Sequence, residues 1–253
     1  MLTKSGFRPG RYDSRDYIYS ARQSSGNTAN AAKVIIEHDV FVIDQGNIIP
    51  CCVSVAVATC LEVLDQNKGT PLSFMYNYYW ARTSRGNLGA LDIRQGLDAA
   101  ASYGICTKTL HDVQLDREGA TTKPNQAARM DAMKRRIAFD PTISTWAYER
   151  FKNSDRIAGW QNAIQYGAPV IMGFDLTDAY KNIPYTDNTH TLPVNEVSSD
   201  GHAVTVMGYD DDHSNGSLKS GAFFIRDSRG AGFADNGHWW LPYELVETHL
   251  IVD

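Results

Sequence analysis

The sequence predicts an α+β fold of two lobes, in which a mainly helical part comes first and a mainly β part follows. Between Cys51 and Tyr103, apolar residues recur at the spacing of helices. In the last third of the chain, short apolar runs are separated by Gly, Asp, Asn and Ser, which is typical of antiparallel strands. The chain has 253 residues, 43% of them hydrophobic, so it can bury a full core.

An arm of residues 1–33 opens the chain. It is rich in Gly, Ser, Arg, Asn and Tyr and lacks sustained periodicity, so we expect an extended segment wrapped on the surface. The apolar stretches 34–36 and 40–43 then predict strand structure that ends at the turn-prone DQGN of residues 44–47. We interpret the chain as one domain, with a helical lobe over about 34–150 and a β lobe over about 151–253.

Helices dominate the first half and the middle of the chain. Glycine can adopt the left-handed conformation that ends a helix, so Gly69 and Gly104 are natural ends for two of them. Residues 107–123 are polar, and we expect them to be irregular. The predicted helices are Cys51 to about Asn67, Ser73–Arg82, Ile93–Tyr103, Arg129–Arg136 and Arg156–Tyr166.

Strands dominate the last third. Each predicted strand is a compact apolar or alternating run bounded by turn-forming residues, as in an antiparallel sheet or barrel. A functional site between the two lobes is the natural expectation. The predicted strands are Pro169–Phe174, Ala203–Tyr209 and Ala222–Asp227.

Charge and hydropathy exclude several kinds of partner. The net charge of -5 and the pI near 5.8 give no basic footprint for nucleic acid, and we interpret the short cluster Lys134–Arg136 as a solvated helix face. No run approaches the roughly 18 apolar residues of a membrane span. We therefore predict neither a nucleic-acid partner nor a membrane span; the oligomeric state is left open.

The N-terminus and the cysteines point to a reducing compartment. Residues 1–17 contain no apolar stretch of the kind found in secretory signals. Four cysteines are too few for a disulfide scaffold, and a bridge between the adjacent Cys51 and Cys52 would be strained. We predict a cytoplasmic protein, or one that acts in a host cytosol.

The adjacent cysteines lie where a predicted helix begins. A thiol at a helix N-terminus is next to unsatisfied N–H groups and the positive end of the helix dipole, which favours its thiolate. A histidine that takes the thiol proton needs a third group to orient it. His202 opens a predicted strand beside Gly201, and Asp227 ends another strand, so both can serve Cys51 in this way.

Three sequence blocks resemble the papain-like cysteine peptidases, most closely their bacterial and viral branch, which lacks a long inhibitory propeptide. The blocks are DQGNIIPC at 44–51, GHAVTVMGY at 201–209 and DSRGAGF at 227–233. The resemblance covers nearly the whole chain and implies the papain-like two-lobe fold, with a helical lobe, a barrel-like antiparallel β lobe and the active site between them.

The resemblance also implies a role for individual residues. Cys51 matches the nucleophile, His202 the catalytic histidine, Asp227 the residue that orients it, and Gln45 the oxyanion-hole glutamine. A peptide or protein substrate is then expected to lie near small residues that let two backbones approach. The implied substrate-binding residues are Gly89, Ala90, Gly201 and Trp239.

Departures from the family pattern leave two points open. Cys52 stands where the family has a large aromatic residue, so the nucleophile still has to be identified by experiment, although the spacing from Gln45 favours Cys51. Asp227 replaces the usual asparagine and Arg229 the usual tryptophan. Arg229 could pair with Asp227 and draw it away from His202.

The implied chemistry is peptide-bond hydrolysis through an acyl-enzyme, without a metal or other cofactor. We interpret the acidic run 210–213 as a solvated loop between strands. Two other functions stay open. The chain could be an inactive papain-like module that binds peptides or regulates, or a thiol acyltransferase or deamidase on the same fold.

Overall fold

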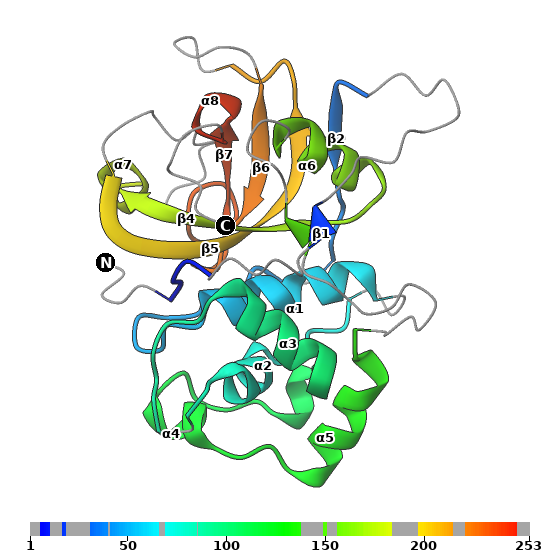
Figure 1. The fold of residues 1–253 in the computed structure, drawn as a ribbon, viewed down its shortest axis with the longest axis vertical. Helices are drawn as coiled ribbons and strands as arrows, with labels where there is room; N and C mark the ends of the chain where they lie inside the picture. Colours follow the sequence, from blue (N-terminus) through cyan, green and yellow to red (C-terminus); the bar gives the residue numbers. More distant parts are fainter. Residues whose placement is uncertain are drawn as a thin grey trace.

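The computed structural model has two parts, and Figure 1 shows α1 to α5 gathered in one and the sheet, with α6, α7 and α8 beside it, in the other. The predicted two-lobe α+β fold is confirmed. The described residues are 6–10, 17–18, 31–39, 41–65, 69–84, 86–137, 149–150, 156–183, 197–214 and 221–246. Much of the predicted arm lies outside this set. The helices of the helical lobe are α1 (Cys52–Leu64), α2 (Phe74–Ala81), α3 (Ile93–Tyr103), α4 (Arg117–Thr121) and α5 (Gln126–Ala132).

An antiparallel sheet forms the β lobe. Its central strand β5 is 14 residues long and curls across the lobe, pairing with β2, β4 and β6, while β7 pairs with β6. Thus β2 belongs to the sheet although it precedes the helices in the chain. A short parallel pair joins β1 (Tyr17–Ile18) to β3 (Glu149–Arg150). The remaining elements are β2 (Lys33–Ile35), α6 (Arg156–Gln165), β4 (Val170–Thr177), α7 (Asp178–Lys181), β5 (Val197–Asp210), β6 (Ala222–Arg226), β7 (His238–Pro242) and α8 (Tyr243–Val246).

Local capping explains why some predicted boundaries are accurate. Helix α3 starts at a capping box in which Asp92 accepts from the Gln95 backbone and the Gln95 side chain accepts from the Asp92 backbone. It ends at Gly104, whose φ is 68°. At the start of α2, the Ser73 side chain accepts from the backbone N–H of Tyr76.

Two predictions in the helical lobe are wrong. Residues 107–123 are not irregular throughout, because they contain a 3-10 turn at Lys108–Leu110 and helix α4. Asp116 caps α4 through the N–H of Gly119, but the helix is too short to show a helical period in the sequence. In the predicted strand at 40–43, residues 41–43 form no strand, and Phe41 is 87% exposed.

The hydrophobic core has two principal clusters. One fills the β lobe around Trp160, Phe223 and Trp239. The other joins the helices to the sheet, and it contains Cys51, Cys52 and the ring of Phe7 from the arm. Within the described part of the chain, no helix combines the length and apolar character that a membrane crossing requires.

A buried carboxyl group lies at the junction of the lobes. Glu62 of α1 accepts from the N–H of Leu72 at 2.7 Å, and its other oxygen lies 3.7 Å from Nε2 of His38. Burial raises the pKa of Glu62 to about 7, although the Leu72 N–H and the charge of Arg226 act in the opposite direction. The carboxyl group is therefore protonated more readily in the folded protein than in the unfolded chain.

We expect Glu62→Gln to remove part of the pH dependence of stability. A pKa raised by folding stabilises the protein fully below the unfolded value, and this contribution is lost as the pH rises through about 7. Glutamine keeps an acceptor for Leu72 but cannot ionise. Urea unfolding should show the variant more stable at pH 8 by about 1–3 kcal/mol and nearly equal to the wild type at pH 4. Equal differences at both pH values would contradict this explanation.

Candidate active site

Two loops bring Gln45 next to Asp227. The backbone N–H of Gln45 donates to the carbonyl of Ser228 at 2.9 Å, and the N–H of Gly230 donates to Ile43 at 3.0 Å. The Ser228 hydroxyl also donates to Oε1 of Gln45 at 2.7 Å. This bond fixes the amide of Gln45 and leaves its NH2 group available as a donor.

His202 and Asp227 form a buried pair. Nε2 of His202 lies 3.2 Å from Oδ1 of Asp227, and both residues are at most 3% exposed. Burial alone lowers the pKa of His202, but the negative charge of Asp227 and the contact with Cys52 outweigh it and raise the pKa to about 10. Burial also opposes ionisation of Asp227, yet His202 and further donors hold its pKa below the usual range.

The sulfur that reaches His202 belongs to Cys52. The Cys52 side chain hydrogen-bonds to His202, and the N–H of Ala203 donates to its Sγ at 3.4 Å. Because Nε2 of the ring faces Asp227, Nδ1 is left to face the sulfur. Cys52 is also the first residue of α1, at the positive end of the helix dipole. The structure therefore places Cys52, His202 and Asp227 in a hydrogen-bonded series, with His202 in the middle.

The assignment of Cys51 from its spacing to Gln45 is corrected by this geometry. Cys51 is the residue before the helix, and its N–H donates to the carbonyl of Ile49 at 2.9 Å in a tight turn through Pro50. This turn adds one residue to the spacing between Gln45 and the start of the helix, so Cys52 faces His202 in place of Cys51. Burial raises the pKa of the Cys51 thiol far above its ordinary value, and Cys52 raises it further. Cys51 is a core residue, as are Cys60 and Cys106, which are also free and buried.

Gly6 and Phe7 of the arm lie directly over Cys52. A Cβ atom on Gly6 would lie 2.6 Å from Sγ of Cys52, so only glycine fits there. Phe7 forms bridges with Leu91 on one side and Gly201 on the other, and its ring packs on Gly173. Cys52 is consequently fully buried.

Hydrogen bonds and an ion pair anchor residues 6–8 of the arm to the helical lobe. The N–H of Arg8 donates to Leu91 at 2.9 Å, and Leu91 donates back to Gly6 at 3.2 Å. The Arg8 guanidinium donates to Gln95 at 2.9 Å and lies 3.7 Å from Asp92. The chain passes between the two lobes here (Figure 1).

The predicted substrate-binding residues have different surroundings. Gly89 and Ala90 precede Leu91, and Gly201 pairs with Phe7, so these three residues adjoin the path that the arm occupies. Trp239 does not adjoin it. Its side chain is fully buried in the core of the β lobe, and Nε1 donates to Oδ2 of Asp227 at 2.8 Å. The substrate-contact role for Trp239 is therefore corrected to support of Asp227.

One contributor to this site has no signal in the sequence. Tyr180, on the short helix α7, donates its hydroxyl to Asp227, although nothing in its local sequence marks it. Gly6 and Phe7 belong to the arm, for which the sequence predicts an extended segment on the surface that could also shield the cleft. A glycine followed by an aromatic residue in a polar arm is a weak signal for such an insertion.

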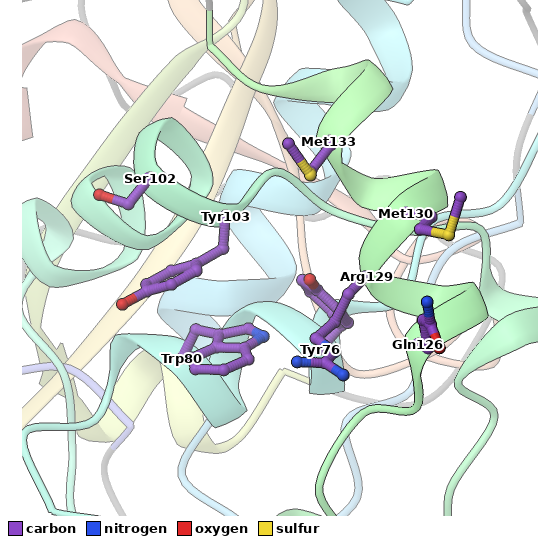
Figure 2. Close-up of a pocket in the computed structure, with 8 residues that line it drawn as sticks. All are labelled: Tyr76, Trp80, Ser102, Tyr103, Gln126, Arg129, Met130 and Met133. Atoms are coloured by element: carbon purple, nitrogen blue, oxygen red, sulfur yellow. The ribbon is translucent and has the colours of Figure 1, made fainter.

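A cavity elsewhere in the helical lobe is separate from this site. It has a volume of about 410 Å³, and Figure 2 shows aromatic and methionine side chains from α2, α3, α5 and the turn after α5 around it. Helix α5 lies at the end of the helical lobe away from the sheet (Figure 1). Cys52, in contrast, contacts the sheet strand β5 through the N–H of Ala203. The cavity is lined by Tyr76, Trp80, Ser102, Tyr103, Gln126, Arg129, Met130 and Met133.

The chain has the papain-like fold. No protein-family model and no curated protein matches the sequence. Among solved structures, xylellain, a cysteine protease from Xylella fastidiosa, superposes with a TM-score of 0.80 at 24% identity, covering 100% of this chain and 95% of that one.

Two further structures share the fold. Digestive procathepsin L 3 of Tenebrio molitor gives a TM-score of 0.63 at 19% identity, covering 94% of this chain and 73% of that one. A cysteine protease of Carica candamarcensis gives 0.58 at 16% identity, covering 84% and 89%. At these identities the likeness establishes the fold.

We expect alkylation by iodoacetamide near pH 7 to fall on Cys52. His202 can accept the Cys52 proton, whereas burial raises the pKa of Cys51 far above neutral pH. Fragmentation mass spectrometry of the peptide carrying both cysteines locates the label. Cys51→Ala should keep the labelling rate, and Cys52→Ala should lower it about tenfold or more. A label on Cys51 in the wild type would refute the correction.

Weakening the arm should expose the sulfur. Phe7→Ala removes the ring that packs on Gly173 and Gly201, so we expect Cys52 to react with iodoacetamide several times faster. Phe41→Ala, at a side chain that is 87% exposed, is the matched control and should leave the rate unchanged. Circular dichroism must show both variants folded. An unchanged rate in folded Phe7→Ala would show that the arm does not limit access.

Proposed function

We propose that this protein is a cysteine-type peptidase, with Cys52 as nucleophile, His202 as general acid and base, and Asp227 as the residue that orients His202. The observation that carries the proposal is the unbroken line from Cys52 through His202 to Asp227, with the Gln45 amide fixed beside it. The corresponding fold in xylellain and in the Carica candamarcensis enzyme belongs to cysteine proteases.

The first half of the reaction forms an acyl-enzyme. His202 takes the proton of Cys52, and the thiolate attacks the carbonyl carbon of the peptide bond. The backbone N–H of Cys52, which as the first residue of α1 has no acceptor within the helix, and the NH2 group of Gln45 stabilise the oxyanion. The C–N bond then breaks, and His202 gives its proton to the leaving amine.

Water completes the cycle. His202, now neutral, takes a proton from a water molecule as its oxygen attacks the thioester. The C–S bond breaks, the peptide acid leaves, and the proton returns to Cys52. Asp227 holds the ring with Nε2 toward itself throughout, so that Nδ1 remains directed at the sulfur and the reacting carbonyl.

The path of the arm supports an extended peptide as the ligand. Leu91 donates and accepts backbone hydrogen bonds there, and Phe7 places a large apolar ring against two glycines. A substrate would replace Gly6, Phe7 and Arg8 along this path. The same observation favours the second candidate, a module that binds peptides without cleaving them, because the chain already holds a peptide segment over the sulfur.

Hydrolysis of a fluorogenic peptide library separates the two candidates. We expect cleavage by the wild type, faster cleavage by Phe7→Ala, and a loss of about a thousandfold or more in kcat for Cys52→Ala. Cys51→Ala is the matched control and should retain activity. An epoxysuccinyl peptide should label Cys52 in the wild type and should not label it in His202→Ala. Binding of peptides by folded wild type and Phe7→Ala without any cleavage would establish the binding module instead.

The pH profile tests the role of Asp227. The raised pKa of His202 keeps its ring protonated up to a pH near 10, above which the imidazolium is lost. Asp227→Asn removes the negative charge and should move the alkaline limb of kcat/KM to lower pH by about one unit or more. An unmoved limb would mean that the charge of Asp227 does not hold the His202 proton.

A further inference from the structure

Tyr180 is enclosed by the aromatic groups around the His202 and Asp227 pair. Tyr180 is fully buried, and its backbone N–H donates to the Thr177 hydroxyl at 3.0 Å. The ring centroid lies 5.3 Å from that of Phe174, 5.5 Å from that of His202 and 5.7 Å from that of Trp239. The hydroxyl group therefore has a fixed position.

That hydroxyl donates to the Asp227 carboxylate. It lies 3.0 Å from Oδ2 and 3.2 Å from Oδ1, the oxygen that also faces His202. Trp239 and the Ser228 backbone donate to the same carboxylate at 2.8 Å each. The carboxylate thus receives donors that hold it in one orientation.

Arg229 lies beside Tyr180, two residues after Asp227. It is 7% exposed, and its guanidinium carbon lies 4.0 Å above the Phe233 ring and 5.5 Å from the Tyr180 ring centroid. A buried arginine close to a carboxylate ordinarily forms a direct, often bidentate, pair with it. Here the guanidinium lies over the Phe233 and Tyr180 rings and hydrogen-bonds to the Tyr180 hydroxyl, which in turn donates to Asp227.

We propose that Tyr180 is a positioning residue that separates Arg229 from Asp227 and so reserves the Asp227 carboxylate for His202. Without the hydroxyl, the carboxylate would lose a donor, and the guanidinium is the neighbouring group with the reach and charge to replace it. Pairing with Arg229 would neutralise Asp227 and weaken its hold on the imidazolium. This role of Tyr180 rests on the proposed function, in which Asp227 orients His202.

Charged and titratable groups from three parts of the chain act on the His202 and Asp227 pair. Cys52 comes from α1, Tyr180 from α7, and Asp227 and Arg229 from the loop after β6. Replacing Cys52 by alanine removes the thiol from the titration. In that background the proton affinity of His202 reports on Asp227, Tyr180 and Arg229.

The test is an NMR titration of the His202 ring in folded Cys52→Ala protein. Four proteins are compared: this background alone, with Tyr180→Phe, with Arg229→Met, and with both. Tyr180→Phe should lower the pKa of His202 by about one unit or more. Adding Arg229→Met should restore it to the value found with Arg229→Met alone. Tyr166→Phe, at an exposed tyrosine, is the matched control and should cause no change.

Each other result overturns the proposal. An unchanged or raised pKa in Tyr180→Phe would mean that the hydroxyl acts as an ordinary donor and separates nothing. A lowered pKa that persists after Arg229→Met would mean that Arg229 is not the group held off. The titration needs no substrate, so failure of peptide hydrolysis would refute the proposed function and leave this result standing.

Discussion

A buried negative charge on Asp227 governs the arrangement of the site. A carboxylate inside a protein is tolerated only when donors and an opposite charge compensate it. Strand β7 supplies Trp239, α7 supplies Tyr180, and β5 supplies His202. His202 in turn meets Cys52 at the start of α1, so the compensation of one charge also fixes how the helical lobe sits on the sheet.

The parts of the fold that could be predicted are those with a local cause. The helix Ile93–Tyr103 was predicted with its observed bounds, because a capping residue and a glycine mark its two ends. Helix α4 has a cap but only five residues, which is too few for an apolar period. The pairing of Phe7 with Leu91 and Gly201 could not be predicted, because it depends on residues far away in the chain.

The residues of the site likewise divide into those with a local sequence pattern and those that only the fold brings together. His202 and Asp227 could be found because each lies in a sequence block with its own pattern, at the edge of a strand. The choice between Cys51 and Cys52 depends on one backbone turn at Ile49, and a count of residues cannot detect such a turn. Tyr180 lies 47 residues from Asp227, so only the folded chain brings them together.

The arm has a consequence for how any peptide can reach Cys52. Because Gly6 and Phe7 are covalently attached to the chain they cover, they compete with a free peptide at an effective concentration on the order of millimolar. A free peptide of equal intrinsic affinity would have to reach that concentration to occupy half of the molecules. Dilution lowers the concentration of free peptide but leaves this internal competitor unchanged, so the occupancy threshold is set by the length and stiffness of the chain itself.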